Sequence, residues 1–158
     1  MKPISDTLVT MLNRQIAHET GNELLYRHIA SYAHTLGLKG IESYFSSQAD
    51  GERDHAGWLR DLLNNANIQI AVPAIPEKPN KFSSCEEIAA LYIEAEASTT
   101  DALEAISRQS DAEYDIAVQS LMQKMLEEQT EEEGSADRFA LLVQLSGGDM
   151  IKLDLAMR

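Results

Sequence analysis

The stretch Glu52-Arg53-Asp54-His55 decides how this sequence of 158 residues is expected to fold. It lies in a run whose inward residues recur every three or four positions, the spacing of one helix face. That face carries Ile41, Phe45, Gln48, Glu52, His55, Leu59 and Leu62. A glutamate and a histidine therefore lie on a buried face, where an unpaired carboxylate costs several kcal/mol. A metal ion would compensate them, and Glu-x-x-His facing into a helical bundle is a known way to hold one.

Composition favours an all-α protein. The sequence is 44% hydrophobic, and its four prolines avoid every long periodic run. The formal net charge of −13 repels nucleic acid and attracts cations. The single cysteine, Cys85, allows no disulfide framework and no thiolate zinc site within the chain. The N-terminus lacks the apolar core of a signal peptide, and no apolar run approaches the roughly 18 residues of a membrane span. We therefore expect a cytoplasmic protein without a nucleic-acid or membrane partner.

Four long helices are expected, followed by a short one. The first begins near Ser5 or Asp6 and ends by Gly37, and the second runs from about Lys39 to Asn65. Capping boxes at Ser83-Ser84-Cys85-Glu86 and Ser110-Asp111-Ala112-Glu113 are predicted to open the third and fourth. On the fourth helix the inward face is predicted to begin at Ala117.

The proline-containing segment over about 66–83 is long enough to cross the whole bundle. About 17 extended residues reach roughly 50 Å, whereas a helix of about 26 residues is roughly 40 Å long. The sequence therefore predicts a single domain over 1–158, with a four-helix bundle at about 5–146 and a short C-terminal helix at about 149–157. One long crossover joins helices two and three. An interdomain linker is disfavoured, because neither flank has enough helices to bury its own apolar face.

Each bundle helix brings polar residues to its inward face near its middle. These residues are Glu19, Glu52 with His55, Glu96, and Gln129 with Glu132. Isolated buried acids would be very destabilising, and converging ones would repel or share protons. A bound cation resolves this, and oxygen donors with one imidazole suit iron, manganese or zinc. Tyr26 lies two turns from Glu19, and two interpretations of it are open. It would supply an electron or a hydrogen bond to the site, or it would be an aromatic core residue whose hydroxyl bonds to a carboxylate.

Taken together, these residues resemble the non-haem ferritins of the bacterial type over roughly Leu12 to Leu155. The resemblance rests on Leu12-Asn13-Arg14-Gln15-Ile16-Ala17-His18-Glu19, Glu52-x-x-His55, Glu96 and Glu128-Gln129-Thr130-Glu131-Glu132-Glu133. It implies that Glu19, Glu52 and His55 hold a first iron, and that Glu96 and Glu132 hold a second, with Glu52 as the bridge. Gln129 would lie beside the pair, and Tyr26 matches a tyrosine found beside the ferroxidase centre.

The resemblance also implies a ferritin-like four-helix bundle and the function of an iron storage and detoxification protein. Such a protein oxidises Fe(II) with O₂ at a di-iron ferroxidase centre, with two Fe per subunit. It deposits ferric mineral inside a homo-oligomeric shell, which by the resemblance has twenty-four subunits. The net charge agrees with this expectation, because carboxylates would attract Fe(II) to the shell.

Two positions depart from the family pattern. Glu128, Glu131 and Glu132 match residues of a third iron site, but the remaining ligand position is occupied by Gly51. A third site is therefore expected to be weakened or absent, or to be completed by a nearby acid such as Asp50. Lys124 stands where many relatives carry an aromatic residue near the centre, which would alter the electron supply.

The sequence leaves open two alternative functions and the binding of haem. The chain could be a helical bundle that binds metal without redox chemistry. It could also be a di-iron oxidase acting on an organic substrate, which would need a pocket beside the metals. Methionine-based haem binding between subunits is also open, although the second helix contains no methionine.

Overall fold

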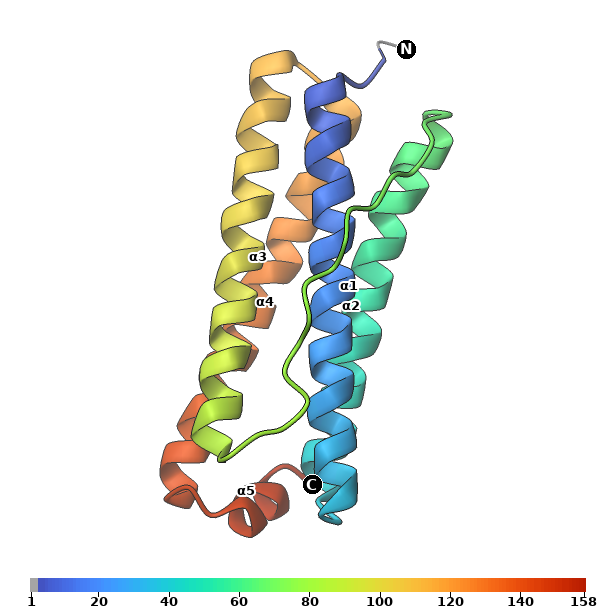
Figure 1. Ribbon diagram of the computed structural model, residues 1–158. Coiled ribbons are helices and arrows are strands. Elements are labelled where there is room, and N and C mark those ends of the chain that lie inside the picture. Colours follow the sequence, from blue (N-terminus) through green and yellow to red (C-terminus); the bar gives the residue numbers. More distant parts are fainter. Residues whose placement is uncertain (1–2) are drawn as a thin grey trace.

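A computed structural model describes residues 3–158, which contain five helices and no strand. The helices are α1 (Asp6–Thr35), α2 (Lys39–Asn65), α3 (Cys85–Glu113), α4 (Ile116–Ser146) and α5 (Met150–Ala156). α1 and α2 run antiparallel, as do α3 and α4, and α5 lies across one end of the bundle (Figure 1). The predicted all-α bundle with a short C-terminal helix is confirmed.

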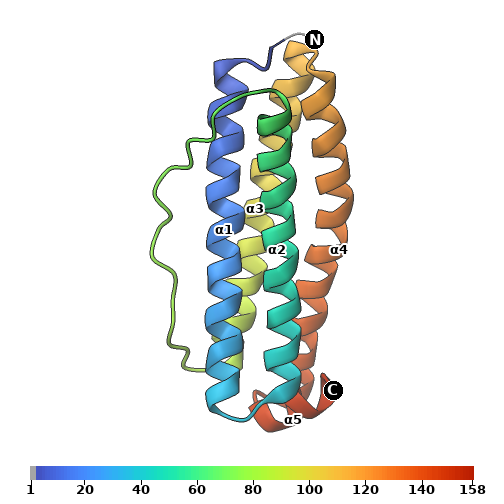
Figure 2. The ribbon, with the colours of Figure 1, turned by 90° about the vertical axis from the view of Figure 1, so that its right-hand side faces the viewer.

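The segment between α2 and α3 is the predicted long crossover. It runs beside α1 from one end of the bundle to the other, so α3 starts at the same end as α2 (Figure 2). Two side chains of α1 hold it in place: the Asn13 side-chain oxygen accepts the Ala71 N–H at 2.8 Å, and His28 Nδ1 lies 2.8 Å from the Pro79 carbonyl oxygen. These contacts satisfy polar groups of a segment that has no secondary structure of its own.

α3 begins one residue later than the predicted box would place it. The Ser84 hydroxyl accepts the Glu87 N–H at 3.1 Å. The Glu87 carboxylate accepts both the N–H and the hydroxyl of Ser83, each at 2.6 Å. Glu87, and not Glu86, is therefore the acidic partner at this helix start.

The predicted capping box at Ser110-Asp111-Ala112-Glu113 is wrong, because these residues form the last turn of α3. The Ser110 hydroxyl donates to the Ser107 carbonyl at 2.8 Å, so its side chain serves the preceding helix. α4 begins instead at Asp115, whose carboxylate accepts the Val118 N–H at 3.1 Å. This later start places Val118 in the core and leaves Ala117 exposed, contrary to the predicted inward face.

The N-terminus of α2 is capped from α5. Leu38 offers no side-chain cap, but an oxygen of the buried Asp154 carboxylate accepts the Ile41 N–H at 3.0 Å. Arg158 donates to the other oxygen at 3.0 and 3.1 Å. A side chain at Gly40 would meet the Asp154 carbonyl oxygen at 2.4 Å, so only glycine permits this approach.

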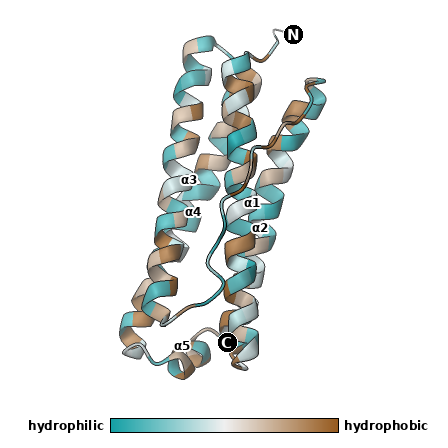
Figure 3. Ribbon diagram, viewed as in Figure 1, coloured by the Kyte–Doolittle hydropathy of each residue, from teal (hydrophilic) through white to brown (hydrophobic). Residues whose placement is uncertain are grey.

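The core consists of two apolar clusters separated by polar residues. One cluster fills the end near α5, and includes Tyr26, Phe45, Tyr92 and Phe139; the other fills the opposite end, and includes Leu12, Leu59, Leu103 and Met122. Between them lies the polar layer, which we define as Glu19, Asn22, Glu52, His55, Glu96, Thr99, Gln129 and Glu132. Hydrophilic and hydrophobic residues alternate along every helix (Figure 3). None of the helices in 3–158 is both long and apolar enough to cross a membrane.

Candidate metal centre

Helix geometry brings the polar layer to one depth in the bundle. Within each helix its members are three residues apart: Glu19 and Asn22, Glu52 and His55, Glu96 and Thr99, Gln129 and Glu132. Residues at that spacing project from the same face, one turn apart. All are buried except Glu132, which is half-buried. The four helices therefore direct carboxylates, amides and one imidazole toward one another.

Glu19, Glu52 and His55 form the tightest group in this layer. Each offers one ligand atom, and these atoms all lie within 4.8 Å of one another. Glu52 Oε2 is 3.5 Å from His55 Nδ1. No other group of three histidine, cysteine or acidic residues with this spacing occurs in 3–158. Two carboxylates and an imidazole are a donor set for divalent iron, manganese or zinc.

Three buried oxygens of the layer have no hydrogen-bond partner within the protein. They are Oε2 of Glu19, Oδ1 of Asn22 and Oε2 of Glu52. Every other buried side-chain nitrogen or oxygen in residues 3–158 has a hydrogen-bond partner. The second oxygen of Glu19 accepts the Gln15 amide at 2.8 Å. Because unpaired buried oxygens are costly, their concentration at one point fits a site built to bind a cation.

Burial raises the pKa of every carboxyl in the layer. It raises the pKa of Glu19 well above its usual range, with a further rise from the neighbouring Glu52 charge. It raises the pKa of Glu52 to about 8, and the charges of Glu96 and Glu132 add to this effect. The pKa of Glu132 rises to about 7, first through burial and then through Glu96. The carboxyls thus hold protons that a cation would displace.

Glu96 is held by two neighbours. The Tyr26 hydroxyl donates to one of its oxygens, and the Gln129 amide donates to the other at 2.7 Å. The same amide contacts the Glu96 carbonyl oxygen at 3.1 Å. Both hydrogen bonds oppose the larger effect of burial, which raises the Glu96 pKa. The structure therefore places Tyr26 and Gln129 on the Glu96 carboxylate.

Comparison with known proteins agrees with this geometry. The ferritin-like domain family matches residues 9–145 of the chain. The chain belongs to the ferritin family. Among its relatives, ferritin BfrB of Mycobacterium tuberculosis is 26% identical over 144 residues, covering 91% of this chain and 80% of that protein. The bacterial non-heme ferritin of Staphylococcus haemolyticus is 26% identical over 132 residues, covering 84% of this chain and 80% of that protein.

Solved ferritin structures superpose on nearly the whole chain. A novel open pore ferritin from the hyperthermophilic archaeon Archaeoglobus fulgidus gives a TM-score of 0.92 with 29% sequence identity. The superposition covers 99% of this chain and 98% of that chain. The ferritin fold therefore extends over all five helices, α5 included.

Glu128, Glu131 and Glu132, the acids predicted for a third iron site of this ferritin, do not form a group of three with ligand atoms within 4.8 Å of one another. Glu128 is half-buried and Glu131 is exposed. A side chain at Gly51 would have only Glu132 Oε1 near it, at 4.0 Å. Asp50, the proposed substitute, is held instead by Arg27 at 2.6 Å and by Arg53 at 3.0 Å. That pairing directs Asp50 away from the polar layer.

An aromatic residue does lie beside the centre, although it was not predicted. Trp58 of α2 has its ring centroid 5.1 Å from that of His55. Lys124 of α4 places its ammonium 3.3 Å from the centroid of the Trp58 ring, a cation–π contact. The lysine that replaces the expected aromatic residue therefore packs on an aromatic ring supplied by another helix.

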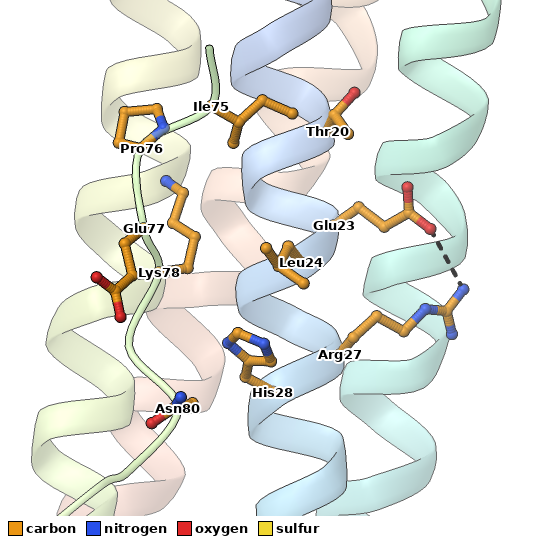
Figure 4. Close-up of a pocket in the computed structure, with 10 residues that line it drawn as sticks. All are labelled: Thr20, Glu23, Leu24, Arg27, His28, Ile75, Pro76, Glu77, Lys78 and Asn80. Atoms are coloured by element: carbon orange, nitrogen blue, oxygen red, sulfur yellow. Dashed lines mark ion pairs between the residues drawn. The ribbon is translucent and has the colours of Figure 1, made fainter.

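A surface pocket of about 490 Å³ lies between α1 and the crossover (Figure 4). Ile75, Pro76 and Lys78 line it on the crossover side, and Glu23 and Arg27 form an ion pair of 3.7 Å on the α1 side. None of its lining residues belongs to the polar layer. This pocket does not provide the substrate site that an oxidase of organic compounds would need beside the metals.

Sequence reasoning missed three contributors to the centre. Gln15 is one turn before Glu19 and donates to it, so its i, i+4 spacing was a usable signal. Asn22 and Thr99 each follow a predicted ligand by three residues, so the spacing indicates their helix faces but not their roles. The contacts of Thr99 with Asn22 and His18 join different helices and cannot be read from the sequence.

Proposed function

We propose that this ferritin stores and detoxifies iron by oxidising Fe(II) with O₂ at the polar layer, which makes it a ferroxidase. The observation that supports this most strongly is the Glu19, Glu52 and His55 group, buried at mid-bundle with unpaired oxygens. Fe(II) is the substrate, and each ion transfers one electron to O₂. The protein contributes ligands, orientation and proton acceptors.

In this proposal the substrate ions occupy two neighbouring positions. Glu19 and His55 bind the first ion, Glu96 and Glu132 bind the second, and Glu52 is shared. Electrostatic coupling of Glu52 to both Glu96 and Glu132 supports the sharing. Binding displaces protons from the carboxyls, because each is more acidic as a metal ligand than as a buried free acid.

Tyr26 and Gln129 prepare Glu96 for the second ion. Each donates a hydrogen bond to one oxygen of that carboxylate, so its plane is fixed before a cation arrives. By the family resemblance, the Tyr26 phenol would also transfer one electron to O₂, becoming a phenoxyl radical as its proton passes to Glu96. The family resemblance assigns Gln129 a further role, the positioning of a water or O₂ beside the ions.

A third iron site is proposed to be weak. Glu128 is half-buried, Glu131 is exposed, and Gly51 has no side chain that could supply a ligand near Glu132. Oxidised iron would then leave the two-ion centre for the interior of a shell of identical subunits, twenty-four by family resemblance. The net charge of −13 supports attraction of Fe(II) to that shell.

Aerobic addition of Fe(II) in stages up to many ions per subunit tests this function against its alternatives. The proposal predicts rapid ferric absorbance, and iron that elutes with the protein in size-exclusion chromatography. A bundle that only binds metal would retain Fe(II) without a ferric signal. An oxidase of organic substrates would oxidise a few ions and retain no mineral.

A further inference from the structure

The function proposed above assigns two of the three unpaired buried oxygens and leaves that of Asn22 without a role. Asn22 is 1% exposed, and it stands three residues after Glu19 and four before Tyr26. These spacings direct all three side chains toward the centre from α1. An amide oxygen enclosed in a core without a partner destabilises the fold unless a ligand pairs with it.

Thr99 determines how the Asn22 amide is oriented. The Thr99 hydroxyl donates its single proton to the Ala95 carbonyl at 3.0 Å, so toward Asn22 it can only accept. Asn22 Nδ2 donates to it at 3.1 Å. His18 Nε2 contacts the same hydroxyl oxygen at 2.9 Å and restrains it. With the amide nitrogen held on Thr99, the amide oxygen is the atom that remains for a ligand.

The Asn22 amide also lies against the ligand group. The Asn22 amide lowers the pKa of Glu52, against the larger rise caused by burial. Asn22 therefore lies near the residue that both ion positions share. The unpaired oxygens of Glu19, Asn22 and Glu52 belong to side chains that all face this point from α1 and α2.

We propose that Asn22 is a further cation-binding residue of the centre, whose amide oxygen binds the ion held by Glu19, Glu52 and His55. This inference rests on the proposed function, because it requires a divalent ion at that position. An amide oxygen adds a donor without adding a negative charge, and so avoids another buried acid.

Asn13 shows what an asparagine with a purely structural role looks like on the same helix. Its amide nitrogen donates to the Val9 carbonyl at 2.9 Å, and its oxygen accepts the Ala71 N–H at 2.8 Å. Both ends of the Asn13 amide are thus used within the protein, whereas Asn22 uses only its nitrogen end. Asn13 is therefore the matched control for Asn22.

The test uses Co(II) as a redox-inert probe of the full-length protein, free of O₂. Calorimetry gives its affinity, visible absorption reports its coordination, and thermal melting gives the stability of the metal-free protein. Asn22→Leu should weaken the tight Co(II) site about tenfold and change the Co(II) spectrum. It should leave the metal-free melting temperature equal or higher, because an unpaired oxygen has been removed.

Two further variants keep the test decisive. Asn22→Asp retains an oxygen and should bind Co(II) at least as tightly as the wild type, which covers the case in which Asn22→Leu folds poorly. Asn13→Leu should keep the wild-type Co(II) affinity and spectrum. Wild-type affinity and spectrum in Asn22→Leu, together with a lower metal-free melting temperature, would overturn the inference and assign Asn22 a structural role.

The same titration separates failure of this inference from failure of the proposed function. If Glu52→Ala loses Co(II) binding while Asn22→Leu does not, the centre stands and only the role of Asn22 is wrong. If the wild type binds no stoichiometric Co(II), both the centre and the role of Asn22 are wrong.

Discussion

At the scale of single residues, Glu52 is the one that the proposal shares between the two ion positions. It belongs to the group with Glu19 and His55, and the charges of Glu96 and Glu132 raise its pKa after the larger effect of burial. One of its oxygens has no partner within the protein. An unpaired buried carboxylate destabilises the metal-free fold, and a bound cation restores that stability.

Cation binding should release protons in a pH-dependent way. With pKa values of about 8 for Glu52 and about 7 for Glu132, both carboxyls are mostly protonated at pH 6. Zn(II) should therefore displace at least one proton per ion at pH 6, and progressively fewer toward pH 9. Calorimetry in two buffers of different ionisation enthalpy measures this number. Proton release that does not change between pH 6 and pH 9 would contradict the assignment.

The metal-free protein should become less stable as pH rises. A carboxyl whose pKa is raised on folding contributes its full stability below the unfolded value of 4.5, and loses it as pH rises through 7 to 8. The melting temperature of the metal-free protein should fall between pH 5 and pH 8, and saturating Zn(II) should reduce that fall. Thermal melts with and without Zn(II) check this, and a rising melting temperature over that range counts against it.

At the scale of elements, sequence reasoning succeeded where one strong pattern was present. α2 was predicted at about Lys39 to Asn65, and the structure has those bounds, because an apolar face runs through the whole helix and ends in a proline-rich segment. The predicted start of α4 was wrong because Ser110 and Asp115 are both residue types that can cap a helix. Ser110-Asp111-Ala112-Glu113 has the sequence of a capping box, but α3 continues through it to Glu113.

The cap of α4 provides a test of that correction. Asp115→Ala removes the acceptor of the Val118 N–H and should lower the free energy of unfolding by about 1 kcal/mol. Asp111→Ala should have little effect, since Asp111 is exposed in the last turn of α3. Urea unfolding of the two variants beside the wild type measures both. A loss in Asp115→Ala that is no larger than the loss in Asp111→Ala would contradict the assignment of Asp115 as the cap.

At the scale of the whole molecule, the bundle and its polar layer were largely predictable, and the local partners were not. Glu19, Glu52, His55 and Glu96 followed from helix periodicity, which fixes both face and depth. The contact of Gln15 with Glu19 lies within α1. Trp58 contacts Lys124 of α4, and Thr99 contacts Asn22 of α1, and helix periodicity does not specify such packing between helices. The position of Asp50 likewise depends on Arg27 from another helix.

Assembly should depend on the apolar surface near α5. Leu145 is 74% exposed on α4 and Ile151 is 67% exposed on α5, and Leu141 and Leu155 are also exposed. In the proposed shell, neighbouring subunits would cover such side chains. The double variant Leu145→Lys with Ile151→Lys should sediment as a smaller species and keep its helical circular dichroism. An unchanged sedimentation coefficient would show that this surface does not hold the shell together.

The central claim is that the polar layer oxidises Fe(II), and stopped-flow absorbance after aerobic mixing with two Fe(II) per subunit tests it most directly. Glu52→Ala and His55→Ala should lose the rapid ferric signal, because each removes a ligand of the tightest group. Glu94→Ala should keep it, since Glu94 is exposed on α3 two residues before Glu96. Wild-type oxidation rates in Glu52→Ala and His55→Ala would contradict the assignment of the centre.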